Sequence, residues 1–298
     1  MDKTDDEFLE VYKYLKRKKR DISLFSVYKG IPVTSVSPIV YAGQNTIIVN
    51  LSEYQAVCLS KFKTIFLKSD VFPRVVQADL VEMDLNSMSA ALSNFRYVQS
   101  GVGERKILRV EPDGRIGGIL QANSVRVYVN GLLADISRQG LALVVRERDI
   151  PGIFSQRGTD VTAFFSLPGV KIPKSTHQGA TLPRYQSSVR PDVFSRFSQL
   201  EKSLFGDNDQ RYTYPHYEYP KGRNYTAPEF GLMGRIVNTR TEYIQGRYRV
   251  GVLLSPADSS NALITKFVTK RQAEIIREIR EIFEQMKKDS RYRISGGN

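Results

Sequence analysis

Short β-branched segments separated by turn residues run through most of this 298-residue sequence, and they constrain its fold more than any other feature. In the first half they lie at residues 31–36, 46–51, 64–67, 75–81 and 90–92. In the second half they lie at residues 124–129, 141–145, 160–167, 232–237 and 248–254. Gly, Pro, Asn, Asp and Ser separate them, which is typical of antiparallel strands joined by turns. The pattern predicts a mainly β protein of two small antiparallel β-barrels in tandem.

Two segments near the chain ends have helical periodicity instead. Residues 5–20 place Phe8, Tyr12 and Leu15 at helical spacing and end in a run of five bases. Residues 269–287 carry a longer apolar stripe, formed by Ile275, Ile276, Ile279, Ile282, Phe283 and Met286. The polar face of this second helix mixes Glu with Arg and is not uniformly basic, so we expect the helix to pack on the second barrel and not on a membrane.

Composition shifts along the chain suggest where the domains begin and end. We expect an N-terminal helix over residues 1–22, an all-β domain over 23–98 and a Gly-containing linker over 99–103. The second domain is then expected over 104–290. It is interrupted at about 172–229 by a segment rich in Pro and Tyr, which we interpret as an insertion between two strands.

The bulk composition limits the chemistry. A net charge of +13 favours an anionic partner, such as nucleic acid, a membrane surface, an acidic protein or a phosphorylated small molecule. The single Cys58 cannot form an internal disulfide, and His177 and His216 lack metal-ligand spacing. The acidic N-terminus has no signal-peptide core and no apolar run is long enough to cross a bilayer, so we expect a cytoplasmic protein without a transmembrane segment.

Two short motifs carry the chemistry that this composition allows. Arg105 and Arg109 form an R-x-x-x-R, and twenty-six residues after Arg109 comes a D-x-S-x-x-G made of Asp135, Ser137 and Gly140. Each motif alone is weak. Their order, spacing and surroundings make the combination specific, because a strand-like segment continues directly from the glycine.

Together these motifs resemble the signature of the PilZ domain. The resemblance extends over residues 104 to about 285, apart from the insertion, and includes the segments 158–161, 167–169, 234–237 and 248–252 and the helix that contains Gln272. It implies a β-barrel receptor for the bacterial second messenger cyclic di-GMP. The implied ligand-binding residues are Arg105, Arg109, Asp135, Ser137 and Gly140, with Arg138 as a further candidate.

The residue types suit this ligand on physical grounds as well. An arginine fork can bond two acceptors at once, either phosphate oxygens or guanine O6 and N7, and it can stack on a purine. A carboxylate such as Asp135 accepts from guanine N1–H and N2–H, and Ser137 can bridge to another polar edge. Gly140 has no Cβ, so it can adopt a positive φ and let backbone amides approach the ligand.

The first domain resembles, more vaguely, the degenerate PilZ-like partner found in flagellar-brake-type proteins. Residues 84–89 are reminiscent of the second motif but have Ser89 in place of its glycine, and no R-x-x-x-R precedes them. We therefore expect no dinucleotide site in this domain. Ligand capture beside the linker would instead reorient the two domains and signal to a protein effector partner.

No nucleophile motif, phosphate-cradling loop or Cys/His pair is present, so we predict a receptor with no cofactor and not an enzyme. Two alternatives stay open. One is a PilZ-fold protein-interaction module that binds no ligand. The other is a basic protein that binds single-stranded nucleic acid through the aromatic and basic segment 211–225. The two motifs favour the receptor, for which we expect no specific nucleic-acid partner.

Overall fold

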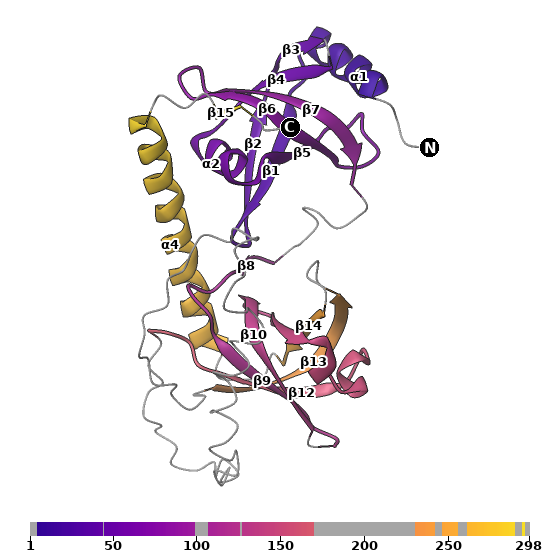
Figure 1. Ribbon diagram of the computed structural model, residues 1–298, viewed down its shortest axis with the longest axis vertical. Coiled ribbons are helices and arrows are strands. Elements are labelled where there is room, and N and C mark those ends of the chain that lie inside the picture. Colours follow the sequence, from indigo (N-terminus) through magenta and orange to yellow (C-terminus); the bar gives the residue numbers. More distant parts are fainter. Residues whose placement is uncertain are drawn as a thin grey trace. The chain divides into compact units, whose positions relative to one another are not determined.

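A computed structural model describes residues 5–43, 45–98, 107–125, 127–169, 230–241, 246–255, 261–289 and 294–295 (Figure 1). The chain forms two compact units. The first comprises Met1–Leu108 together with Gln272–Asn298, and the second comprises Arg109–Arg271. Within the described ranges, no helix combines the length and the apolar character needed to cross a membrane.

The first unit is an antiparallel sheet with three helical segments, of which the last is part of α4. Its elements are α1 (Asp5–Arg17), β1 (Ile22–Tyr28), β2 (Ile31–Ser37), β3 (Ile39–Gly43), β4 (Thr46–Asn50), α2 (Glu53–Phe62), β5 (Thr64–Lys68), β6 (Val76–Asp84), β7 (Ser89–Tyr97) and β15 (Ile294–Ser295). The strand order is β2-β1-β5-β6-β7-β4-β3, with β15 beside β6. The predicted strands of this half are all confirmed, whereas β1 and β3 were not predicted.

This first sheet is an open half-barrel, which agrees with the predicted small antiparallel β domain. Its two ends, β2 and β3, do not pair with each other among the described residues. They are consecutive in the chain and separated by Pro38, which has no backbone N–H to give to a ladder. The predicted N-terminal helix α1 packs on β3, β4 and β7 instead. Its fully buried Phe8 and Tyr12 contribute aromatic contacts to this unit's core.

The helix α2 was missed because its apolar residues are consecutive and do not recur at helical intervals. Ser52 caps its first turn by accepting a hydrogen bond from the Gln55 backbone N–H. The Gln55 side chain is completely buried and donates to the backbone oxygens of Leu24 (3.1 Å) and Val33 (2.9 Å). A buried amide that completes its hydrogen bonds in this way fixes α2 against β1 and β2.

The second unit is a closed antiparallel barrel. Its strands are β8 (Arg109–Val110), β9 (Gly117–Ala122), β10 (Val127–Ser137), β11 (Gly140–Arg146), β12 (Asp160–Phe165), β13 (Phe230–Thr241) and β14 (Arg247–Leu254), with short 3-10 turns at Glu147–Asp149 and Gly152–Ser155. Six of them follow the order β11-β14-β13-β12-β9-β10, and a pairing of β10 with β11 closes the ring. The short strand β8 pairs with the far end of β10.

Buried apolar residues at alternate positions explain why strands of this barrel could be predicted. On β14, Val250, Val252 and Leu254 are buried, and Leu253 between the last two is exposed. The predicted segments 141–145, 232–237 and 248–254 fall within strands, whereas 160–167 runs past the end of β12 and 124–129 begins before β10. The strand β9, which begins Gly117-Gly118, lacks this signal and was not predicted. The predicted insertion at 172–229, with His177 and His216, lies outside the described residues.

The C-terminal helix α4 (Asn261–Lys288) is confirmed, but it is not devoted to the second barrel alone. Its residues up to Arg271 belong to the second unit, where Ile264 and Val268 are buried. Its residues from Gln272 belong to the first unit, where Ile279 and Phe283 are buried. The apolar stripe is therefore long because it supplies two cores in succession.

One carboxylate on the later part of α4 has a dense set of partners within the first unit. Glu278 accepts hydrogen bonds from the Tyr28 hydroxyl (2.9 Å) and from the Lys29 ammonium group (2.7 Å to each oxygen). Burial raises the pKa of the Glu278 carboxyl, but the Lys29 hydrogen bonds and charge outweigh it, so the pKa lies below its ordinary value of 4.5.

We expect Glu278→Gln to lower the free energy of unfolding of the protein at pH 7 relative to Glu281→Gln, an exposed neighbour on the same helix. A carboxyl whose pKa is lowered by folding stabilises the folded state above its ordinary pKa, and this contribution is lost as the pH falls through the folded-state value. The difference between wild type and Glu278→Gln should therefore shrink below about pH 4.5. Urea unfolding at several pH values measures it; a difference that is unchanged at pH 3 would contradict the assignment.

Candidate functional site

The short strand β8 places the predicted site residue Arg109 beside two others, Asp135 and Ser137. Arg109 lies opposite Ser137 in the ladder, and Val110 lies opposite Ile136. Val110 and Ile136 are completely buried, so the apolar member of β8 fixes the strand on the barrel. The Arg109 side chain remains 34% exposed. It is therefore both positioned by the barrel and accessible from outside.

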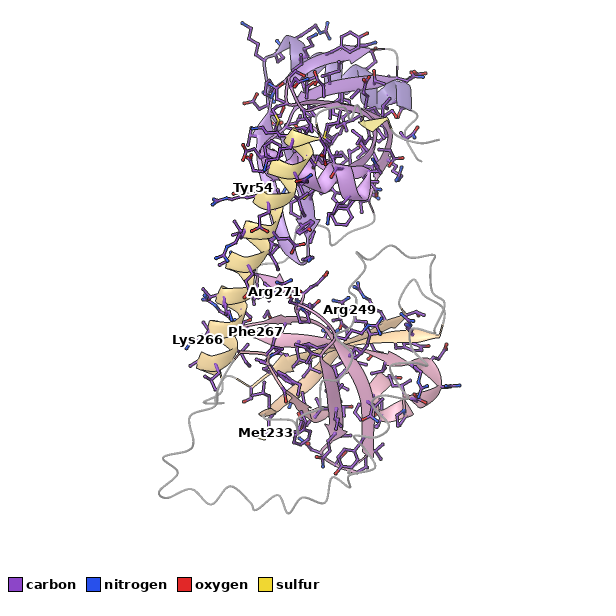
Figure 2. All side chains as sticks on the ribbon, turned by 60° about the vertical axis from the view of Figure 1, so that its left-hand side comes forward. Tyr54, Met233, Arg249, Lys266, Phe267 and Arg271 are labelled. Carbon is purple, nitrogen blue, oxygen red and sulfur yellow. The ribbon has the colours of Figure 1, made fainter. Side chains whose placement is uncertain are left out.

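Asp135 is the centre of the site. Its side chain is only 4% exposed and contacts two guanidinium groups. Arg109 Nη1 donates to Asp135 Oδ1 at 3.3 Å, and Arg249 Nη2 on β14 donates to Asp135 Oδ2. Figure 2 shows the position of Arg249 on the barrel. A carboxylate buried to this degree costs free energy unless it is paired, so the two arginines are what allow Asp135 to occupy this position.

A β-bulge turns Asp135 toward the outside of the barrel. The register between β10 and β11 shifts between Leu133 and Asp135. As a result Leu133 and Ile136, which are three residues apart, are both buried among the core residues. Asp135 and Ser137 lie on the opposite face of β10 from Ile136. Bulges that re-aim a side chain in this way are common beside functional sites.

The Ser137 hydroxyl takes part in the turn that joins β10 to β11. It donates to the backbone oxygen of Gly140 (2.9 Å) and accepts from the backbone N–H groups of Gly140 (3.1 Å) and Gln139 (3.4 Å). These contacts fix the turn that carries the second motif. Arg138, the further candidate, lies in the same turn and is exposed.

Gly140 is required for a different reason from the predicted one. Its φ is not positive, so it does not adopt the left-handed conformation that a glycine allows. A Cβ at this position would instead lie 2.5 Å from the backbone oxygen of Val252 on β14. The glycine therefore permits close approach of two strands within the barrel. The backbone of the adjacent strand β14 therefore accounts for a glycine at this position.

Arg105 and the predicted linker at 99–103 lie outside the described residues. Arg109 is thus the described member of the R-x-x-x-R motif. The segment that follows it is held by α4, because Arg271 Nε donates to the backbone oxygen of Glu111 at 3.0 Å. The Arg271 side chain, labelled in Figure 2, is 5% exposed. This buried guanidinium group fixes the chain just after β8 and so helps to position Arg109.

Sequence reasoning missed Arg249 as a site residue. It lies on β14 beside the buried Val250, and its side chain is 20% exposed. The sequence pattern identifies it only as an arginine on a strand. Nothing local identifies its partner, because Asp135 is 114 residues away in the sequence.

The barrel face around Asp135 is rich in arginine. Arg249 lies directly opposite Arg240 on β13, and Arg247 lies opposite Arg146 on β11. Like charges in directly opposed positions destabilise a sheet unless an anion lies beside them. Here Asp135 pairs with Arg249, and Asp149 pairs with Arg146. Among the described residues there is no group of three or more His, Cys, Asp and Glu side chains that could hold a metal ion.

We expect Gly140→Ala to destabilise the protein, because the added Cβ meets backbone that cannot move aside without disturbing β14. Overpacking of this kind costs about 1–3 kcal/mol. Gly152→Ala is the matched control, since a Cβ there has no heavy atom within 4 Å. Chemical denaturation of both variants measures the difference, and equal stability of the two would refute the close-approach explanation.

No protein-family model matches the chain, and no curated protein matches it. Solved structures do resemble it over nearly its whole length. The MrkH–c-di-GMP complex of K. pneumonia is 11% identical, with 93% of this chain and 99% of that chain covered and a TM-score of 0.39. YcgR of Escherichia coli in complex with c-di-GMP is 9% identical, with 95% of each chain covered and a TM-score of 0.32.

The Bacillus subtilis inhibitor of motility, MotI/DgrA, is 9% identical, with 86% of this chain and 97% of that chain covered and a TM-score of 0.32. At these identities and TM-scores the similarity by itself carries no argument about function. Two of these three solved structures are complexes with c-di-GMP. The function of this chain is therefore inferred from the arrangement of Asp135, Arg109 and Arg249.

Proposed function

We propose that this protein is a receptor for cyclic di-GMP, which it binds on the outer face of the second barrel. The observation that carries the proposal is the Asp135 carboxylate, buried on that face between guanidinium groups from β8 and β14. A ligand with two guanines and two phosphates needs an acceptor for guanine donors and cations for phosphate. This arrangement offers both within one set of contacts.

Asp135 can accept hydrogen bonds from guanine while it keeps its contacts with Arg109 and Arg249. Each ionised carboxylate has about four lone-pair directions, and the two arginines use one on each oxygen. The two that remain suit the N1–H and N2–H donors of one guanine. Because the two arginines already hold the carboxylate in one orientation, binding needs little reorganisation at this end of the site.

The arginines are proposed to bind the phosphates and the purine faces. Arg109 is one-third exposed and lies at the rim, so its guanidinium plane can stack on a base or bond a phosphate. Arg105 is proposed to act beside it, and Arg138 to add positive charge at the turn. Ser137 and Gly140 are proposed to shape the turn that the ligand contacts.

The proposed role is signalling and not catalysis. Residues 99–103 join the first unit to the segment that carries Arg105 and Arg109, so a ligand held by these arginines would also hold the end of the linker. We expect this to reorient the two domains and to change the surface that is presented to a protein effector. No cofactor besides the bound dinucleotide is needed for this role.

The experiment that tests the proposal is a calorimetric titration of cyclic di-GMP into the wild-type chain and into the variants Arg105→Ala, Arg109→Ala, Arg249→Ala and Asp135→Asn. Loss of one well-made contact to a guanine or phosphate should cost about 1–3 kcal/mol, which is roughly a five- to hundredfold loss of affinity. The matched control is Arg96→Ala, which removes a bidentate Arg96–Asp79 pair in the first unit.

The outcomes separate the possible functions. Binding by wild type and by Arg96→Ala, weakened in the four site variants, supports the receptor. Absence of binding by wild type would refute it and favour an interaction module without ligand. Binding of a single-stranded oligonucleotide instead, with affinity that falls steeply as salt is added, would favour the nucleic-acid alternative.

A second prediction tests the proposed signal. We expect cyclic di-GMP to slow hydrogen exchange of the backbone amides in residues 99–106 in wild type but not in Arg109→Ala at the same ligand concentration, because ordering of this segment requires the arginine contacts. Mass-spectrometric exchange on the full chain measures this. Unchanged exchange at saturating ligand would show that binding is not transmitted through these residues.

A further inference from the structure

A row of four residues crosses the outer face of the second barrel and extends the candidate site beyond the two sequence motifs. Asp135 on β10 lies opposite Ala142 on β11. Ala142 lies opposite Gly251 on β14, and Gly251 lies opposite Asn238 on β13. The row therefore has a polar group at each end and the two smallest residue types between them.

The Asn238 side chain lies over the glycine. A Cβ added to Gly251 would overlap the Asn238 amide, with Oδ1 as its nearest atom. The amide thus leans along the row in the direction of Asp135. Asn238 is nevertheless an exposed residue, and its side chain makes no hydrogen bond within the part of the chain that the structure describes. Its donor and acceptor are available to a ligand.

Both polar ends of the row are set by β-bulges. The β10–β11 register shifts just before Asp135, and the β13–β14 register shifts between Ile236 and Asn238. Each bulge changes which face of its strand the next side chain occupies. Two separate irregularities therefore bring a carboxylate and an amide to the same row of one face.

The dimensions and charge of the row suit one dinucleotide. Three strand spacings separate its ends, which is at most about 14 Å along a curved sheet. Arg249 precedes Gly251 by two residues on β14 and lies opposite Arg240 in the β13–β14 ladder. These arginines supply positive charge beside the small-residue floor, where the phosphates of a ligand that spans the row would lie. Its two bases would then reach opposite ends.

The two ends differ in what they can recognise. A carboxylate only accepts hydrogen bonds, so Asp135 suits guanine N1–H and N2–H and not adenine, whose N1 is an acceptor. A carboxamide both donates and accepts, so Asn238 can pair with guanine through O6 and N1–H or with adenine through N1 and N6–H. One end is selective for guanine and the other accepts either purine.

From this geometry we infer that Asn238 reads the second base of the ligand and determines specificity, so that the site takes cyclic di-GMP and the hybrid cyclic GMP–AMP but rejects cyclic di-AMP. This rests on the proposed function and deepens it. Asn238 acts together with Asp135. Gly251 has no side chain, so it leaves room for the ligand between them.

The test is a calorimetric titration of three 3′,3′-linked ligands, cyclic di-GMP, cyclic GMP–AMP and cyclic di-AMP, into the full chain. We expect wild type to bind the hybrid within about tenfold of cyclic di-GMP and to bind cyclic di-AMP at least about a hundredfold more weakly, since one satisfied base edge is worth about that factor. Asn238→Ala should weaken both guanine-containing ligands about tenfold.

The variant Asn238→Asp provides a readout that a structural role would not change. A second carboxylate still accepts from guanine but repels the N1 lone pair of adenine, so the preference for cyclic di-GMP over the hybrid should increase at least about tenfold. Asn86→Ala, an exposed asparagine in a turn of the first unit, is the matched control and should bind like wild type.

Each outcome supports or overturns a defined statement. If wild type binds cyclic di-GMP and Asn238→Ala binds it equally well, or if wild type rejects the hybrid, this inference is overturned while the receptor proposal stands. If wild type binds none of the three ligands, the receptor proposal fails and this inference fails with it. Denaturation of each variant checks that a loss of binding is not a loss of folding.

Discussion

The pairing of Asp135 with Arg109 and Arg249 is the interaction on which the second unit's outer face depends. A carboxylate that is 4% exposed is stable only when cations and hydrogen-bond donors replace its water. Those cations come from two strands that are far apart in the sequence, β8 and β14. The barrel must therefore be closed, with β8 attached to β10, before the site exists. Fold and site are specified by the same contacts.

Small residues and β-bulges also position the side chains on this face. Gly140 lets β11 approach β14, and the bulge before Asp135 turns the carboxylate outward. The same two devices recur on the neighbouring strands, where a bulge precedes Asn238 and a glycine lies beneath its amide. Local irregularity in an otherwise regular barrel is thus concentrated on the face that carries the charged groups, which is where function requires side chains to depart from simple alternation.

The sequence allowed prediction of those strands, helices and residues that a local pattern determines. Alternation predicted β11, β12 and β14, and the apolar stripe predicted α4. The motifs predicted Arg109 and Asp135, which the structure places in contact. Long-range partners could not be predicted, because nothing near Arg249 points to a carboxylate 114 residues away.

Finer details of the fold could not be predicted for a similar reason. The ends of the first sheet stay open beside Pro38 and a helix that packs on the neighbouring strands, and neither feature is visible in strand periodicity. The division of α4 between two units is likewise invisible in a stripe that is continuous over its length. The close approach of Gly140 to β14 was not predicted, since a glycine in a motif does not reveal which neighbour requires it.

The first unit shows what separates a site from a turn of similar sequence. Asp84 ends β6 and accepts hydrogen bonds from the Asn86 backbone N–H (2.9 Å) and the Ser87 hydroxyl (2.8 Å). It is exposed, and its oxygens stabilise its own turn. Asp135 instead lies within a strand, two residues before the turn, where a bulge and two arginines hold it buried on an outer face. The same residue type stabilises its own turn in one unit and pairs with two distant arginines in the other, because its position in the strand decides which donors its oxygens can reach.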